Sequence, residues 1–279
     1  MFKFKLLVCL AFVLASVLPA SAAVKETISL SRVENKAEKR IKQIHAIYFE
    51  VEGNLPSEKT KLGSKVEKWF DGIISSELGI SSPAEYEDAN GLLAYYSKGF
   101  LSQGRKDVIQ LLKFQKEQKD TTNIRITYTY NATVSKVYET GGFITFMVES
   151  YVYMGGAHGS QYRTYGTFRK DNGALLSWHD LFSAKKLPIL RGLVSDGLQG
   201  YFGVMDFKSM RERLLIDGKY SRTTFPLPKG NPGLLGDGLH VQYSDYEIAP
   251  HAAGLPTTTI SYGQIKNCWT TDARKLWRK

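Results

Sequence analysis

The sequence predicts an α+β protein in which an antiparallel meander sheet packs against several helices. Apolar residues recur every third or fourth position between residues 57 and 111, which is the spacing of an amphipathic helix. From residue 123 to residue 170 the period changes to two, as expected for half-buried strands. Aromatic residues make up 12% of the chain, and its 16 tyrosines favour half-buried positions in a sheet.

The N-terminal part of the chain predicts a single strand before the first helix. Residues 23–40 are polar and charged, and we expect them to form a loose arm. Residues 41–51 (IKQIHAIYFEV) are rich in β-branched and aromatic residues and predict a strand, which ends at residues 53–56. Ser57 is the expected cap of the helix that follows.

Two helical regions are expected next. The apolar face of the first is formed by Leu62, Val66, Trp69, Ile73 and Leu78. The second opens at residues 81–83 (SSP) and continues to Leu111, either as one helix or as two separated at Gly99 and Gly104.

The meander and a mixed C-terminal region complete the chain. Three strands are predicted at residues 124–137, 143–154 and 160–170, joined by glycine-rich turns. Further helices are expected at residues 190–201 and 210–216, and closing strands at residues 239–243 and 257–262. The change of pattern near residue 120 separates an N-terminal region, 23–120, from the region 121–279. It marks either a domain boundary or the helix-to-sheet seam of one α+β unit.

The first 22 residues have the pattern of a secretory signal peptide. Lys3 and Lys5 precede an apolar stretch at residues 6–18, and Ala20-Ser21-Ala22 supplies small residues for cleavage. We expect cleavage near Ala22 and an exported protein that is periplasmic or secreted. No later stretch approaches eighteen consecutive apolar residues, so we expect no membrane span.

Charge and cysteine content narrow the classes of partner. Cleavage after Ala22 would lower the net charge from +10 to +8, because it removes two lysines and no acid. A basic exported protein is attracted to anionic material of the cell envelope, whereas nucleic acid is disfavoured by export. Cys268 would be the one remaining cysteine, so no internal disulfide is expected. Beside Trp269, a buried and unreactive thiol is favoured over a nucleophile.

Three segments together resemble a known family. They are Tyr151 to Gly159 (YVYMGGAHG), Trp178 to Phe182 (WHDLF) and Tyr246 to Gly254 (YEIAPHAAG). They are similar to the hallmarks of domain of unknown function 3298, which is usually preceded by domain of unknown function 4163. The likeness covers roughly residues 40–262, and it departs from the family at His251, where tyrosine is common.

The resemblance implies an α+β fold and a place outside the cytoplasm. The two domains form the extracellular half of the lysozyme-sensing sigma-V anti-sigma factor, and they also precede the catalytic domain of some peptidoglycan deacetylases. Deacetylase activity belongs to that separate catalytic domain, so the resemblance implies the module by itself.

The candidate binding residues lie in two glycine-containing segments. In the first, glycines allow a sharp turn from which His158 would project, either as a structural histidine or as a ligand contact. In the second, Pro250 and small residues allow close packing under the sheet or a binding groove. The candidates are Tyr151, Tyr153, Gly155, Gly156, His158, Tyr246, Glu247 and His251.

Catalytic and cofactor motifs have little support. Asp180, Asp245 and Glu247 could supply a carboxylate pair for glycoside hydrolysis if the fold brought them together. The histidines have no HxH or HExxH spacing, and the chain has no GxSxG, P-loop or GxGxxG motif. We therefore expect no catalytic residue, metal or cofactor.

Three functions remain open, in order of preference. The first is a non-catalytic module that binds cell-wall glycan or another anionic envelope component, with tyrosines stacking on sugars and Lys and Arg pairing with carboxylates. The second is a receptor or inhibitor of a lysozyme-type protein, although a basic lysozyme would be repelled unless a local acidic patch compensates. The third is a hydrolase of envelope glycan or peptide.

Overall fold

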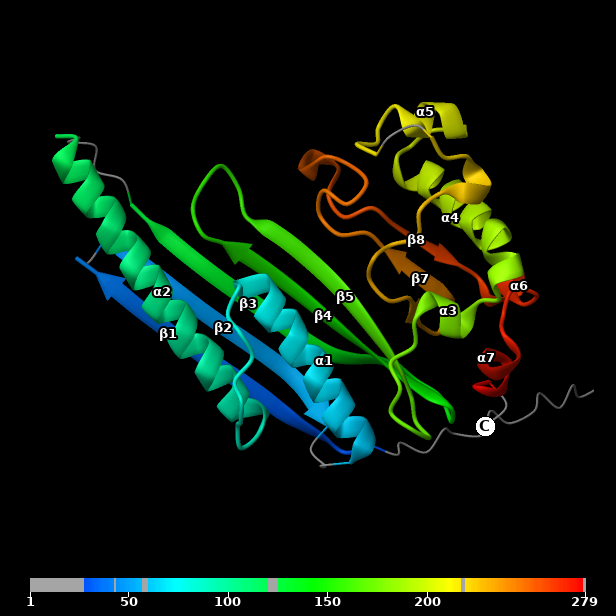
Figure 1. Ribbon diagram of the computed structural model, residues 1–279, viewed down its shortest axis with the longest axis horizontal. Helices are drawn as coiled ribbons and strands as arrows, with labels where there is room; N and C mark the ends of the chain where they lie inside the picture. Colours follow the sequence, from blue (N-terminus) through cyan, green and yellow to red (C-terminus); the bar gives the residue numbers. More distant parts are fainter. Residues whose placement is uncertain (1–27, 43, 57–59, 120–124, 217–218, 278–279) are drawn as a thin grey trace, which may run out of the picture.

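The computed structural model describes residues 28–42, 44–56, 60–119, 125–216 and 219–277. Five strands and two long helices form a first lobe, which we call the sheet lobe (residues 28–173), and the remainder forms the C-terminal lobe (Figure 1). The elements of the sheet lobe are β1 Leu30–Ile41, β2 His45–Pro56, α1 Lys61–Leu78, α2 Ala89–Glu117, β3 Thr127–Glu139, β4 Phe143–Tyr153 and β5 Ser160–Arg169.

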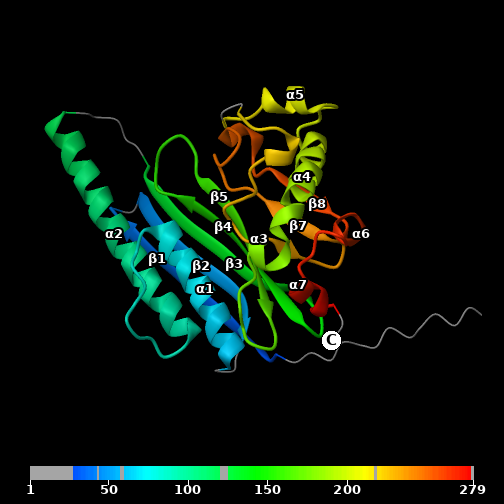
Figure 2. The ribbon, with the colours of Figure 1, turned by 45° about the vertical axis from the view of Figure 1, so that its right-hand side comes forward.

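The sheet of the first lobe has strand order β1-β2-β3-β4-β5. Its strands are antiparallel except for β2 and β3, which run parallel. α1 and α2 cover one face of the sheet, and the C-terminal lobe lies on its other side (Figure 2). The predicted α+β class and the meander of β3, β4 and β5 are confirmed.

Alternate residues of the strands build the core between the sheet and the helices. Phe49 of β2 stacks on Tyr130 of β3 with ring centroids 5.4 Å apart, and both contact Phe100 of α2. All three side chains are fully buried. Because strand side chains alternate between faces, the neighbours of these residues point to the opposite face, which we call the open face.

The expectation of a loose arm at residues 23–40 is wrong for its described part. β1 pairs with β2 along its whole length, from Leu30 opposite Pro56 to Ile41 opposite His45. Val33 is buried, while charged residues at alternate positions, including Lys36, stay exposed. A charged edge strand discourages pairing with other chains, so its composition resembles that of a loop.

The second helix begins later than expected and is not broken. Residues 81–83 are not helical, and the side chain of Asp88 caps α2 by accepting from Gly91 N at 2.8 Å. A Cβ at Gly104 would lie 3.1 Å from Ile47 of β2, so this glycine permits close packing on the sheet rather than a break. The expected cap Ser57 lies outside the described residues, and α1 is capped by Thr60.

The C-terminal lobe has its own core around a three-stranded sheet of order β6-β7-β8. The elements are α3 Trp178–Leu181, η1 Ala184–Lys186, α4 Leu187–Tyr201, α5 Phe207–Arg211, η2 Arg222–Thr224, β6 Gly233–Leu234, β7 Leu239–Gln242, η3 His251–Ala253, β8 Thr257–Ile260, α6 Tyr262–Ile265 and α7 Thr271–Lys275. The helix expected at residues 210–216 is present as the short helix α5, which begins and ends earlier than expected.

The basic segment at residues 273–277 packs onto the C-terminal lobe. Ala273 and Leu276 are buried in the second core. The Trp277 ring meets Phe143 of β4 edge to face, with centroids 4.9 Å apart. The basic residues of this segment concealed its apolar face, which recurs at a helical spacing.

Two threonines attach the C-terminal lobe to the open face of the sheet. Thr145 of β4 donates to Leu234 O at 2.7 Å, and Thr167 of β5 donates to Pro232 O at 3.1 Å. Both threonines are fully buried. The lobe therefore covers one end of the open face and leaves the other end uncovered.

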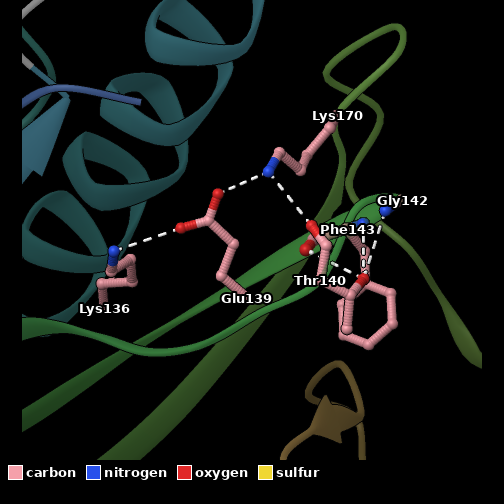
Figure 3. A network of polar contacts seen from close by, with 6 residues as sticks. All are labelled: Lys136, Glu139, Thr140, Gly142, Phe143 and Lys170. Atoms are coloured by element: carbon pink, nitrogen blue, oxygen red, sulfur yellow. Dashed lines mark hydrogen bonds and ion pairs between the residues drawn. The ribbon is translucent and has the colours of Figure 1, made fainter. Parts of the chain in front are cut away.

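An ion-pair network holds the turn between β3 and β4 beside this junction (Figure 3). Glu139 accepts hydrogen bonds from Lys136 at 3.1 Å and from Lys170, and Lys170 also donates to Thr140 O at 3.0 Å. Burial alone would raise the pKa of the Glu139 carboxyl, but the two lysines outweigh burial and lower it. The turn places Phe143 in the second core.

The sheet joins the regions before and after residue 120, where the sequence pattern changes. β2, before this point, pairs with β3, after it, from Ala46 opposite Thr127 to Gly53 opposite Val134. The parallel direction of this pair requires a long crossover, which α1 and α2 supply.

Glu77 of α1 provides a test of the helix-to-sheet packing. Its carboxylate accepts from Tyr130 at 2.9 Å and from Ser150 at 2.8 Å. Burial raises its pKa despite these bonds. A raised carboxyl pKa contributes stability that is complete below the unfolded-state pKa and is lost as pH rises through the folded-state pKa. Glu77→Gln has no carboxyl group to ionise, so its stability should not fall in this way as pH rises. We therefore expect the free energy of unfolding of the variant, minus that of the unmodified protein, to increase from pH 4 to pH 8.

Urea unfolding at several pH values measures this difference. Glu85→Gln serves as the control, because Glu85 is exposed in the segment between the helices. Equal pH profiles for the Glu77 and Glu85 variants would contradict the proposed burial effect.

Candidate functional site

The uncovered end of the open face forms a groove with a volume of about 410 Å³. Its floor is made by β2, β3, β4 and β5, and Leu255 of the C-terminal lobe contributes to it. The residues that line it are Glu50, Glu52, Asn131, Ala132, Thr133, Glu149, Ser150, Tyr151, Gln161, Tyr162, Arg163 and Leu255.

Strand register arranges the polar residues of the floor in two rows across the sheet. One row is Glu50, Asn131, Tyr151 and Gln161, which are successive partners in β2, β3, β4 and β5. The adjacent row is Glu52, Thr133, Glu149 and Arg163. On every strand the two rows are two residues apart, and residues two apart in a strand point to the same face. All eight side chains therefore share the open face.

Part of the floor is held by ion pairs. Arg163 donates to one oxygen of Glu149 through Nε at 2.8 Å and through a terminal nitrogen at 2.6 Å. Lys36 of β1 lies 2.7 Å from Glu50, and the hydrogen bond to that carboxylate raises the pKa of the lysine. Both pairs are substantially exposed, so they position side chains more than they stabilise the fold.

The other polar side chains of the floor have no such partner. Within the described ranges, Glu52, Asn131, Thr133 and Gln161 make no side-chain hydrogen bond and no ion pair. Their amide and hydroxyl groups can both donate to and accept from a ligand, and the carboxylate of Glu52 can accept. The groove therefore offers hydrogen-bonding capacity that the protein itself does not use.

An aromatic cluster joins the two lobes near the groove. The ring of His158, from the turn between β4 and β5, stacks on His251 of η3 with centroids 3.7 Å apart and planes 12° apart. Tyr246 flanks both rings and lies 3.3 Å from His158 Nε2 through its hydroxyl. The two segments singled out in the sequence thus meet in space.

Hydrogen bonds determine how the two imidazoles are oriented. His158 Nδ1 donates to Gly159 O at 3.1 Å, which leaves Nε2 to accept from the Tyr246 hydroxyl. His251 Nδ1 donates to Asp245 at 2.8 Å, and the Asp245 side chain is only 6% exposed. The buried carboxylate holds the ring of His251 in place beneath His158.

Backbone geometry explains the remaining candidates. Gly155 and Gly156 have φ values of 90° and 92°, in the left-handed region that favours glycine, and Tyr153 donates to Gly156 O at 3.1 Å. Glu247 accepts from Lys229 N at 2.7 Å and from Ser244 N at 2.8 Å, so both its oxygens stabilise the loop. Tyr246 itself has a φ of 59°.

The predicted residues therefore divide between two places. Tyr151 lies in the groove, whereas His158, Tyr246 and His251 form the adjacent cluster. Gly155, Gly156, Tyr153 and Glu247 shape the two loops. The prediction missed the polar residues of β2, β3 and β5. The signal that could have found them is alternation, because on each strand two polar residues are separated by one residue that faces away from the groove. These pairs are Glu50 and Glu52, Asn131 and Thr133, and Gln161 and Arg163.

The carboxylates considered for hydrolysis are engaged elsewhere. Asp180 accepts from Ser177 N at 2.8 Å in the capping box of α3. Asp245 binds His251, and Glu247 binds backbone amides. Cys268 is buried, as predicted, and burial raises the pKa of its thiol.

Every helix among the described residues is too short or too polar to cross a membrane. The same residues contain no group of three His, Cys, Asp or Glu side chains that could hold a metal ion.

Comparison with solved structures identifies two proteins of similar fold. A member of the DUF3298 family from Bacteroides fragilis aligns with a TM-score of 0.71 and 17% sequence identity, over 92% of this chain and 100% of that one. A DUF3298 family protein from Pseudomonas aeruginosa aligns with a TM-score of 0.59 and 15% identity, over 89% and 97% of the two chains. At these identities the likeness establishes the fold.

Comparison of sequences identifies the family. No curated protein matches the chain. The family described as Deacetylase PdaC matches residues 19–161, which include the helices, the five-stranded sheet up to the start of β5, and most of the groove floor. The match spans more than half of the chain, and the protein accordingly belongs to the Deacetylase PdaC family.

Proposed function

We propose that this protein is a non-catalytic module of the cell envelope that binds glycan in the groove of the open face. The observation that carries the proposal is the groove floor, where Glu52, Asn131, Thr133 and Gln161 have no side-chain partner among the described residues. Ligand sites are concave and contain a few convergent polar groups, and this groove has both properties.

Sugar rings suit the chemistry of the floor. Each hydroxyl of a sugar can donate and accept, so it pairs with amides and carboxylates alike. Tyr151 adds an aromatic ring beside Gln161. A Cβ at Gly159 would lie 2.4 Å from this ring, which shows that the turn packs tightly against Tyr151.

The charge of the groove changes the ligand expected from the sequence. The lining contains three glutamates and Arg163, and Arg163 is already bound to Glu149. Lysine or arginine side chains are therefore not free in the groove to pair with ligand carboxylates. We infer that the bound part of the glycan is uncharged or carries an amino group.

The proposed location of this binding module rests on the first 22 residues and on the family resemblance. The signal-peptide pattern predicts export to the periplasm or beyond the cell, and its residues lie outside the described ranges. The resemblance to domains that precede the catalytic domain of some peptidoglycan deacetylases supports an association with envelope glycan.

A lysozyme-type protein is a second candidate ligand, favoured by the same carboxylates. The net charge of the chain would repel a basic lysozyme unless an acidic patch compensated. Glu50 and Glu149 are paired with Lys36 and Arg163, so the negative charge available to such a protein is that of Glu52, which has no ion-pair partner among the described residues. The lysozyme-sensing protein that the sequence resembles supports this candidate.

The glycan proposal is tested by binding of residues 23–279 to insoluble sacculi. We expect the protein to pellet with them without release of soluble sugar or peptide. Gln161→Ala and Asn131→Ala should each weaken binding about fivefold, because each removes a hydrogen bond worth about 1 kcal/mol.

Gln110→Ala is the matched control, since it removes an exposed amide from α2 on the opposite face of the sheet. Protein that stays entirely in the supernatant at low salt would refute the glycan proposal. Release of soluble fragments would instead indicate hydrolysis.

The lysozyme candidate is tested by calorimetric titration. We expect binding that weakens with salt and that falls about threefold in Glu52→Gln, as is typical for the loss of one exposed charge. Glu212→Gln, an exposed substitution in the C-terminal lobe, should leave the affinity unchanged. An absence of heat with the unmodified protein would remove this candidate.

A further inference from the structure

The outer side of α2 is the most positively charged helical surface of the sheet lobe. α2 runs unbroken for 29 residues, a length of about 43 Å, and its C-terminal end extends past the sheet in both views (Figures 1 and 2). The helix carries five cationic residues against Asp107 and Glu117. The five are Lys98, Arg105, Lys106, Lys113 and Lys116, and all are exposed.

These five cations lie along one side of the helix. Lys98 and Arg105 are seven residues apart, as are Lys106 and Lys113, and seven residues make nearly two helical turns. Lys113 lies 3.9 Å from Glu117, a loose pair at the surface. Among the described residues the other four have no carboxylate within 4.0 Å. Their charges are therefore available to a partner.

Two large apolar side chains are exposed on the same side of α2. At about 3.6 residues per turn, Ile109 lies within the arc that the cations occupy, and it is 45% exposed. Tyr95, near the start of the cationic row, lies in the same arc and is 42% exposed. Exposed aromatic and aliphatic groups next to unpaired cations are characteristic of helices that lie in the interface of a membrane.

We propose that this side of α2 docks on an anionic lipid surface. The cations would contact the headgroups, while Ile109 and Tyr95 would enter the boundary with the acyl chains. A soluble polyanion could neutralise the cations but would leave these apolar side chains in water. The combination of charge and apolar exposure therefore favours lipid.

The proposal is independent of the glycan groove and compatible with it. α2 and the groove lie on opposite faces of the same sheet. A protein held to a lipid surface through α2 would keep the groove directed away from that surface. The groove would then remain open to water and to its ligand.

Vesicle sedimentation tests the proposal. The purified chain from residue 23 onwards excludes the apolar stretch at residues 6–18 from the assay. We expect it to pellet with vesicles of phosphatidylcholine and phosphatidylglycerol, but not with phosphatidylcholine alone. The triple variant Lys106→Gln, Lys113→Gln, Lys116→Gln should reduce partitioning by about tenfold or more, given the attraction of each cation to the surface.

Two matched controls distinguish an effect of the α2 surface on vesicle binding from an effect of the net charge of the chain. Lys185→Gln, Lys208→Gln, Lys266→Gln removes three exposed charges from the C-terminal lobe and should have a much smaller effect. Ile109→Ser should weaken binding about threefold or more, whereas Met205→Ser, at a side chain that is 95% exposed, should not.

Equal losses in the two triple variants would overturn the proposal, as would binding to phosphatidylcholine alone. Displacement by soluble polyphosphate with no effect of Ile109→Ser would identify a polyanion site and would also overturn it. None of these results depends on sacculus binding, so the two proposals fail separately.

Discussion

The contact between two buried threonines and the backbone of β6 determines the architecture of this protein. Thr145 and Thr167 lie on the open face of the sheet, where apolar side chains would otherwise be expected under a packed lobe. The Thr145 hydroxyl donates to a carbonyl of β6, the Thr167 hydroxyl donates to the carbonyl of Pro232 just before it, and Leu234 N donates back to Thr167 at 3.2 Å. Buried polar groups are costly unless they are paired, so these bonds favour the observed position of the C-terminal lobe. That position leaves the groove uncovered.

Much of the fold was predictable because its elements carry local signals. The strands β3, β4 and β5 alternate cleanly between turns, and α4 has the spacing of an amphipathic helix. β1 was missed because its charged residues face water along the edge of the sheet, which gives the strand the polar composition of a loop. At Gly104 the local helix-breaking tendency is outweighed by close packing against Ile47, which the sequence does not display.

The candidate site was predicted only in part, for a related reason. The glycine turn and the loop containing Tyr246 are visible as short motifs, and the structure brings His158 and His251 of these motifs into contact. The groove floor depends on register between four strands. Asn131 and Gln161, for example, reach the same row through Tyr151, and no motif within a single strand reveals this.

The parallel seam between β2 and β3 has a consequence for the order of folding. The hairpin of β1 and β2 and the meander of β3, β4 and β5 each join neighbours in the sequence, so their loop-closure entropy is small. The seam joins segments separated by both long helices, and it can close only when α1 and α2 have packed across it. Because distant contacts form slowly, we expect the centre of the sheet to be the last part of the first lobe to assemble.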